Sequence, residues 1–226
     1  MRPEPTLPPG FVSSCQPVRG GWFDEPDIVV RYARVSEAAG ARALRIESLR
    51  DLRAVRPVTR LPITGLIKRE IPGSDVFITP TPDDVLALAE AGADVIAFDA
   101  TDRPRPHTID ALLAATQAAD KEAMADVATF EEGITAWNAG CTYVGTTLSG
   151  YVAGSPELEG PDLELVRRLS QAGVRTIAEG RIATPDEARE AIRLGAYAVT
   201  IGTAISRPER LAEAFAAAIE NAIENA

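Results

Sequence analysis

The feature that most constrains the fold of this chain is a regular alternation of short apolar segments with longer Ala- and Leu-rich segments. Short apolar runs bounded by charged or turn-forming residues are typical of strands buried in a parallel sheet. The longer runs are amphipathic, as surface helices are. Eight such pairs follow one another from Phe11 to the end of the chain. This rhythm is the one that a (β/α)8 TIM barrel requires.

The predicted strands are Phe11–Gln16, Ala43–Ile46, Ile63–Lys68, Val95–Asp99, Ala123–Asp126, Tyr143–Thr146, Arg175–Glu179 and Ala198–Ile201. The predicted helices lie near Pro26–Ala39, Ser48–Val55, Pro82–Ala91, Thr108–Ala119, Phe130–Ala139, Asp162–Ala172, Pro185–Leu194 and from Glu209 onward. Two of these helices begin with Thr, Pro and two acidic residues, at Thr81 and Thr184. This order places a threonine at the N-cap, proline at the first helical position and acids in the first turn.

The length of the chain, 226 residues, is sufficient for one barrel with a sizeable core. We expect residues 11–226 to form a single catalytic domain. Residues 1–10 are rich in proline, and we expect a flexible leader or a loose plug there. A doubly wound parallel sheet is the alternative architecture. It is disfavoured because no G-x-G-x-x-G sequence follows the first predicted strand.

The formal net charge of −10 argues against a nucleic-acid partner, which would need a basic face. It is compatible with an anionic small ligand, because a few arginines and helix N-termini suffice to bind a phosphate. No apolar run approaches the roughly 20 residues of a membrane helix, and the Pro-rich start lacks the apolar segment of a secretory signal. We therefore expect a cytoplasmic protein with no membrane partner.

Polar side chains stand at the ends of several predicted strands. Because barrels place their chemistry where the carboxyl ends of the strands meet, these side chains are expected to share one mouth. Lys68 and Glu179 are the candidates for acid–base work, since burial lowers the pKa of a lysine toward values useful for proton transfer. Taken singly, Lys68 could be a solvated rim lysine. The other strand-end candidates are Gln16, Arg45, Asp99 and Asp126.

The last two predicted strands are followed by glycine-bearing turns. Gly180-Arg181 follows the seventh strand, and Gly202-Thr203 follows the eighth, with Arg207 shortly after. Barrels commonly bind phosphate between these two loops through backbone N–H groups and a helix N-terminus. We expect a phosphate-binding site there, although both glycines could be ordinary turn residues.

Metal chemistry is poorly supported by the sequence. His107 is the only histidine, so a site built from histidine and carboxylates cannot be assembled. An all-oxygen magnesium site from Asp99 and Asp126 is possible but is not needed, and no metal or organic cofactor is expected. The long loops predicted after the third and sixth strands could form a lid over a substrate.

Several phrases of the sequence together resemble one family of barrel enzymes. They are Ser14-Cys15-Gln16, Ile67-Lys68-Arg69, Asp99-Ala100-Thr101, Met124-Ala125-Asp126, the run Gly145-Thr146-Thr147-Leu148-Ser149-Gly150-Tyr151, Ala178-Glu179-Gly180-Arg181-Ile182 and Gly202-Thr203-Ala204-Ile205. In this order, from Val12 nearly to the end, they resemble the N-acetylmannosamine-6-phosphate 2-epimerases of sialic-acid catabolism, a (β/α)8 family.

The resemblance implies interconversion of N-acetylmannosamine 6-phosphate and N-acetylglucosamine 6-phosphate by inversion at C2, without a cofactor. It implies that Lys68 is the acid/base for the C2 proton and that Glu179 assists it. The substrate-binding residues that it implies are Gln16, Arg45 and Asp126 for the sugar and acetamido groups, and Gly180, Arg181, Gly202, Thr203 and Arg207 for the phosphate.

Two other functions stay open at this point. The same barrel could be a lyase or isomerase of another phosphorylated substrate, with Lys68 forming a Schiff base. It could also be a non-catalytic protein that binds a sugar phosphate. The Ala-rich segment from Leu211 to Ala226 carries Phe215, Ile219 and Ile223 at helical spacing. It could complete the barrel or pack against a partner, and we expect a homodimer.

Overall fold

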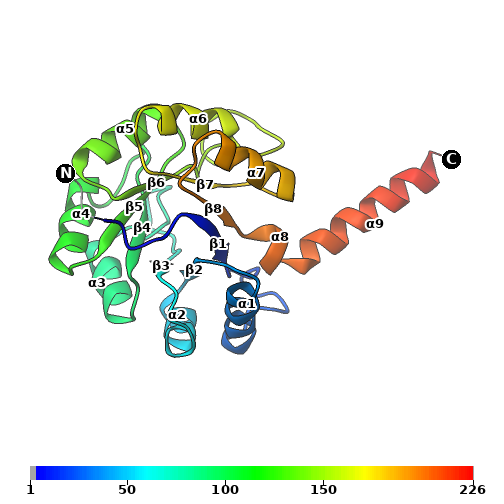
Figure 1. Ribbon diagram of the computed structural model, residues 1–226, viewed down its shortest axis with the longest axis horizontal. Helices are drawn as coiled ribbons and strands as arrows, with labels where there is room; N and C mark the ends of the chain where they lie inside the picture. Colours follow the sequence, from blue (N-terminus) through cyan, green and yellow to red (C-terminus); the bar gives the residue numbers. More distant parts are fainter. Residues whose placement is uncertain (1–3, 226) are drawn as a thin grey trace.

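Eight parallel strands close into a barrel in the order of the chain, from β1 beside β2 around to β8 beside β1 (Figure 1). The computed structural model describes residues 4–225. The strands are β1 (Gly10–Ser14), β2 (Ala43–Glu47), β3 (Ile63–Leu66), β4 (Val95–Asp99), β5 (Glu122–Asp126), β6 (Tyr143–Gly145), β7 (Thr176–Glu179) and β8 (Ala198–Ile201). The predicted (β/α)8 barrel is therefore confirmed.

The helices lie outside the barrel between successive strands. They are α1 (Pro26–Ala38), α2 (Leu49–Val55) with the 3-10 turn η1 (Arg56–Val58), α3 (Pro82–Glu90), α4 (Ile109–Ala118), α5 (Phe130–Ala139), α6 (Leu163–Gln171) and α7 (Pro185–Arg193). Thr81, Thr129 and Thr184 each accept a hydrogen bond from the backbone N–H three residues on, in a capping box. These caps explain why α3, α5 and α7 begin at Pro82, Phe130 and Pro185.

Two predicted strands end two residues earlier than expected. β1 ends at Ser14 and β3 at Leu66, so Gln16 and Lys68 each lie two residues beyond a strand. The reason at Lys68 is local, because its backbone forms an antiparallel bridge with Ile78 of its own loop instead of continuing beside β2 and β4. Both residues consequently stand above the mouth of the barrel.

The apolar core has an inner part, inside the barrel, and an outer part, between the strands and the helices. Successive side chains of a strand point to opposite sides, so every second residue enters the barrel. Val12, Ala43, Leu66, Met124 and Ile177 belong to one buried cluster inside it. Side chains at intervening positions, such as Leu44 and Ile63, pack outward against the helices. A filled interior leaves the mouth as the place for polar side chains.

Residues 4–9 lie across the amino end of the barrel, where the sequence predicted a flexible leader or a loose plug. Leu7 is buried within the inner cluster. Its N–H donates to the hydroxyl of Tyr143 at 2.8 Å, and its carbonyl accepts from the hydroxyl of Tyr197 at 2.7 Å. These bonds and the burial of Leu7 pack the segment against the amino end of the barrel. Residues 1–3 of the predicted leader lie outside the described part of the chain.

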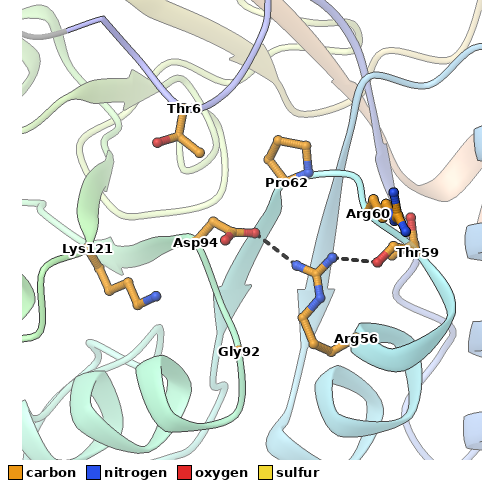
Figure 2. Close-up of a pocket in the computed structure, with 8 residues that line it drawn as sticks. All are labelled: Thr6, Arg56, Thr59, Arg60, Pro62, Gly92, Asp94 and Lys121. Atoms are coloured by element: carbon orange, nitrogen blue, oxygen red, sulfur yellow. Dashed lines mark hydrogen bonds and ion pairs between the residues drawn. The ribbon is translucent and has the colours of Figure 1, made fainter.

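A cleft of about 600 Å³ lies at the same amino end, beside the starts of β3 and β4 (Figure 2). Within it Arg56 donates to the carboxylate of Asp94 at 3.0 Å and to the carbonyl of Thr59 at 2.7 Å. Asp94 also accepts from the N–H of Ile63 at 2.9 Å. These bonds satisfy backbone groups at the ends of elements, so the charged residues here have a structural role.

The chain leaves the barrel after β8. A short helix, α8 (Thr203–Ser206), is followed by α9 (Pro208–Glu224), which extends away from the other helices (Figure 1). The sequence predicted one helix from Glu209 onward and treated residues 202–205 as a turn. Among the described residues of α9 none is buried, so this helix does not complete the wall of the barrel.

Within residues 4–225, no helix is both long enough and apolar enough to cross a membrane.

Candidate active site

Polar side chains form the top of the barrel interior, one layer above the apolar cluster. Arg45 lies two residues after Ala43 on β2, Asp126 two after Met124 on β5, and Glu179 two after Ile177 on β7. The alternation of a strand therefore turns all three side chains inward. Gln16 and Lys68 stand above them, beyond the ends of β1 and β3.

Lys68 and Gln16 are joined directly. The ammonium Nζ of Lys68 donates to the amide oxygen of Gln16 at 2.6 Å, and the amide nitrogen of Gln16 donates to the hydroxyl of Ser14 at 2.8 Å. Burial lowers the pKa of Lys68 from its ordinary value, although the carboxylate of Glu47 acts in the opposite direction. The lysine is thus held in a defined direction and is a stronger proton donor than a solvated one.

Arg45 and Asp126 form a buried bidentate ion pair. Two nitrogens of the Arg45 guanidinium donate to the two carboxylate oxygens of Asp126, at 3.2 Å and 2.6 Å. Burial disfavours the charge of Arg45, but Asp126 and Glu179 outweigh this effect and raise the pKa of Arg45. The hydroxyl of Thr147 donates to Asp126 at 2.7 Å. The pair is therefore a fixed charged floor beneath the lysine.

Glu179 has one carboxylate oxygen without a hydrogen-bond partner among the described residues. Its Oε1 lies 3.2 Å from Nε of Arg45, whereas the buried Oε2 has no hydrogen bond. Burial raises the pKa of Glu179 to about 7 despite the opposing charges of Arg45 and Lys68. A buried polar atom left unpaired costs free energy, and such atoms are common where a ligand completes the bonding.

The backbone of Glu179 is fixed by the loop after β6. The hydroxyl of Thr146 donates to the carbonyl of Glu179 at 2.9 Å and accepts from its N–H at 3.1 Å. Gly180 then takes φ = 107° and Arg181 φ = 55°, so the chain turns sharply as it leaves β7. Only glycine adopts the first of these conformations without strain.

The guanidinium of Arg181 points into the loop after β6. Its Nε donates to the carbonyl of Gly160 at 2.8 Å, and its Cζ lies 4.8 Å from the ring centre of Tyr151. A Cβ on Gly150 would lie 2.5–2.7 Å from this guanidinium. Arg181 therefore holds the two ends of residues 150–160 together, and its guanidinium is engaged there, whereas the predicted phosphate site concerns the turn that Gly180 and Arg181 form.

The turn after β8 is built around Gly202. It precedes α8, whose first residue is Thr203, and a Cβ on Gly202 would lie 3.4 Å from Ser14 of β1. Ser206 donates to the carbonyl of Ser14 at 3.0 Å, and Nε of Arg207 donates to the carbonyl of Gln16 at 3.0 Å. These bonds bring the predicted phosphate residues of the β8 turn beside the strand that carries Gln16.

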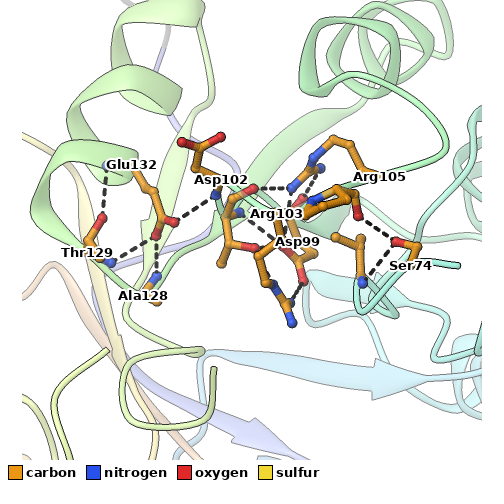
Figure 3. Close-up of polar contacts among 11 residues, drawn as sticks. Ser74, Asp99, Asp102, Arg103, Arg105, Ala128, Thr129 and Glu132 are labelled. Atoms are coloured by element: carbon orange, nitrogen blue, oxygen red, sulfur yellow. Dashed lines mark hydrogen bonds and ion pairs between the residues drawn. The ribbon is translucent and has the colours of Figure 1, made fainter. Parts of the chain in front are cut away.

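The carboxylate of Asp99, predicted to be one of the free polar groups of the mouth, is engaged by its own loop (Figure 3). It is fully buried and accepts hydrogen bonds from Thr101, Arg103 and Arg105, the bond from Arg103 being 2.5 Å long. This correction has a simple cause, because the residues that follow β4 fold back over their own strand end. The magnesium site considered for Asp99 and Asp126 is therefore not assembled, since each carboxylate is bonded to arginine.

The same loop ties neighbouring loops together. Glu132 of α5 accepts from the N–H of Asp102 at 2.8 Å, and Ser74 donates to the carbonyl of Pro104 at 2.8 Å (Figure 3). In the described part of the chain no group of three or more His, Cys, Asp and Glu side chains is placed to hold a metal ion. The loops after β3, β4 and β5 thus form one connected rim.

Two residues of the site were not singled out by the sequence reasoning. Thr147 contacts Asp126 in the floor, and Glu47 lies beside the segment that carries Lys68. The hydroxyl-rich run after β6 was a usable signal for Thr147. Glu47 gave no comparable signal, because an acid at the end of a strand is usually solvated.

A closed (β/α)8 barrel with a lysine and an incompletely bonded glutamate at its mouth is the architecture of a barrel enzyme. Comparison with known proteins gives the family. Residues 29–221 match the family model described as "Putative N-acetylmannosamine-6-phosphate epimerase". The chain belongs to this family of 2-epimerases, and it is accordingly an isomerase.

Relatives cover nearly the whole chain. A Klebsiella pneumoniae protein with the corresponding 2-epimerase name is 50% identical over 214 residues, which are 95% of this chain and 91% of that protein. One from Salmonella typhimurium is 50% identical over 211 residues, 93% of each chain. The solved N-acetylmannosamine-6-phosphate 2-epimerase from Clostridium perfringens is 38% identical, covers 91% of each chain and superimposes with a TM-score of 0.89.

Proposed function

We propose that this protein interconverts N-acetylmannosamine 6-phosphate and N-acetylglucosamine 6-phosphate, and that Lys68 carries the proton that is exchanged at C2. The observation that supports this most strongly is the half-buried Lys68, held on Gln16 at 2.6 Å above the Arg45–Asp126 pair and the unbonded oxygen of Glu179. The names of the relatives supply the substrate.

The reaction needs a base, because C2 carries a C–H bond that is acidic only when C1 is an aldehyde. An open-chain form of the sugar therefore precedes proton removal. Neutral Lys68 takes the C2 proton, which leaves an enolate whose negative charge needs a cationic neighbour. Arg45 supplies a fixed positive charge beneath the site and does not reorganise, since Asp126 holds it. Return of a proton to the opposite face completes the inversion.

Glu179 assists the lysine in this proposal. Its unbonded Oε2 is available to the ammonium or to a substrate hydroxyl, and its charge and that of Lys68 influence each other. Gln16 binds the hydroxyl and acetamido groups of the sugar, and Asp126, which is fully buried, contributes to substrate binding by holding Arg45 in place. Arg45 adds to the binding of the sugar through its positive charge.

The phosphate is proposed to bind between the turns after β7 and β8. Gly202 and Thr203 offer backbone N–H groups at the start of α8, and Arg207 adds a positive charge. Gly180 and Arg181 contribute their backbone N–H groups rather than the guanidinium of Arg181, which is bonded to Gly160. Such turns suit phosphate because glycine lets the backbone approach the anion closely.

To test this function, the purified protein is incubated with N-acetylmannosamine 6-phosphate, and the products are separated by chromatography. Appearance of N-acetylglucosamine 6-phosphate supports the proposal, and its absence rejects it. Borohydride added during turnover separates the Schiff-base alternative, because only an aldimine on Lys68 would be reduced to a stable adduct. A binding protein would retain the substrate without converting it.

We further propose a homodimer. Leu211, Phe215, Ile219 and Ile223 of α9 are between 57% and 71% exposed. They recur at intervals of four residues, so they share one face of the helix. An apolar face of this kind is typical of an interface, and a second copy of the chain is its proposed occupant. Light scattering should give the mass of a dimer for the wild type and of a monomer for Phe215→Glu.

A cytoplasmic location is also proposed. It is supported by the phosphorylated substrate of the family, because a charged sugar phosphate does not cross a lipid bilayer unaided. Fractionation of the source cells checks it.

A further inference from the structure

Glu47 is a charged residue of the mouth that the proposed reaction does not use. It is the last residue of β2, two positions after Arg45, and its side chain is 16% exposed. It lines a cleft of about 210 Å³ together with Gln16, the residue that accepts the hydrogen bond of Lys68. Glu47 therefore borders the same small space as the residue that holds the amine of Lys68.

Arg19 connects Glu47 to the segment that carries the lysine. One nitrogen of its guanidinium lies 3.3 Å from Oε1 of Glu47 and 3.0 Å from the carbonyl oxygen of Lys68. This nitrogen therefore bridges the Glu47 carboxylate and the backbone of Lys68. The side chain of Arg19 is 71% exposed, so the ion pair itself adds little stability. Its effect is to orient Glu47.

The charges that act on Lys68 come from several elements. Burial lowers the pKa of Lys68, and the largest opposing influence is the negative charge of Glu47 on β2. Arg45 on β2 and Arg207 after α8 lower this pKa, and Glu179 on β7 raises it less than Glu47 does.

The other acids of the cleft are already paired. Asp24 accepts from the guanidinium of Arg50 and from the N–H of Gly20, and Asp51 accepts from Arg50 at 2.8 Å. Glu47 differs from them in its partner, because Arg19, which it contacts, also donates to the carbonyl oxygen of Lys68.

We propose that Glu47 is a positioning residue for Lys68. Glu47 keeps the lysine at the mouth and stabilises the ammonium form of the lysine through a carboxylate that Arg19 orients. This inference rests on the proposed function, since it gives Glu47 a role through the lysine that moves the proton. Removal of the C2 proton converts a neutral amine into an ammonium and leaves the electron pair on the enolate. A carboxylate beside the new ammonium stabilises that charge-separated state.

The composition of the chain makes a direct test feasible. Lys68 and Lys121 are the only lysines, so protein labelled with [13C]lysine gives two sets of lysine NMR signals, which Lys68→Arg assigns. A pH titration then follows the two amines separately in the wild type, Glu47→Gln and Glu47→Asp. We expect the midpoint of Lys68 to move to lower pH in Glu47→Gln and to an intermediate value in Glu47→Asp, while that of Lys121 stays constant.

Glu70→Gln is the matched control, because it removes an exposed carboxylate two residues from Lys68 and should leave both midpoints unchanged. An unchanged Lys68 midpoint in folded Glu47→Gln overturns the proposal. If that variant does not fold, a midpoint in Glu47→Asp equal to that of the wild type overturns it. The titration needs no turnover, so failure of this inference is distinguishable from failure of the wild-type enzyme to epimerise its proposed substrate.

Discussion

The guanidinium of Arg45 and the carboxylate of Asp126 meet through two hydrogen bonds inside the barrel, where Asp126 is fully buried and Arg45 is 2% exposed. The two residues come from β2 and β5, which are not neighbours in the sheet. Their pairing therefore spans the interior and fixes the polar layer on which the proposed chemistry depends.

Removal of one partner of this pair should lower the free energy of unfolding strongly. Asp126→Ala leaves a buried guanidinium without its main counter-charge, and we expect a fall in the free energy of unfolding of about 3–5 kcal/mol. Urea denaturation measures it. Glu213→Ala is the control, because it breaks an exposed pair with Arg210 and should cost about 1 kcal/mol or less. Equal losses in the two variants would contradict the assigned importance of the buried pair.

The raised pKa of Glu179, about 7, predicts the pH dependence of turnover. The ionised carboxylate stabilises the ammonium of Lys68, and it forms as the pH rises through this pKa. We therefore expect kcat/KM to increase with pH across about pH 7 in the wild type. Glu179→Gln has no ionisable group there and should lack this limb of the profile. A variant that retains the same limb would show that another group causes it.

Arg207 should affect binding more than chemistry. Hydrogen bonds to charged groups contribute about 1.5–3 kcal/mol, and a tenfold change in affinity corresponds to about 1.4 kcal/mol. Arg207→Ala is thus expected to raise KM by about tenfold or more, with a smaller change in kcat. Arg207→Lys keeps the charge and should recover part of the loss. Steady-state kinetics at several substrate concentrations measure both constants. An unchanged KM would show that Arg207 does not bind the phosphate.

Gly150 should be required for the position of Arg181. Gly150→Ala adds a Cβ in contact with the guanidinium at a residue with φ = 77°. Gly154→Ala is a matched control, because its φ is 85° and no atom lies within 4 Å of the added Cβ. Both changes carry the strain of positive φ, so only the excess loss in Gly150→Ala reports the contact. We expect a lower melting temperature for Gly150→Ala than for Gly154→Ala, and equal values would contradict this.

The barrel could be predicted because hydrophobic periodicity and threonine caps are local signals that the tertiary structure reinforces. The direction of side chains that lie beyond the strands could not be predicted. Arg103 and Arg105 turn back to Asp99, and Arg181 donates to Gly160, since loops fold according to contacts that no periodicity encodes. The direction of α9 was equally hidden, because an apolar helical stripe looks the same whether it faces the barrel or a second chain.

In the proposed reaction, Lys68 moves the C2 proton. Proton NMR of N-acetylmannosamine 6-phosphate in deuterated water tests it most directly, with wild-type protein and with Lys68→Ala shown to be folded by circular dichroism. The wild type should release N-acetylglucosamine 6-phosphate that carries deuterium at C2, and the variant should show neither product nor exchange. Continued incorporation of deuterium at C2 by Lys68→Ala would contradict the claim.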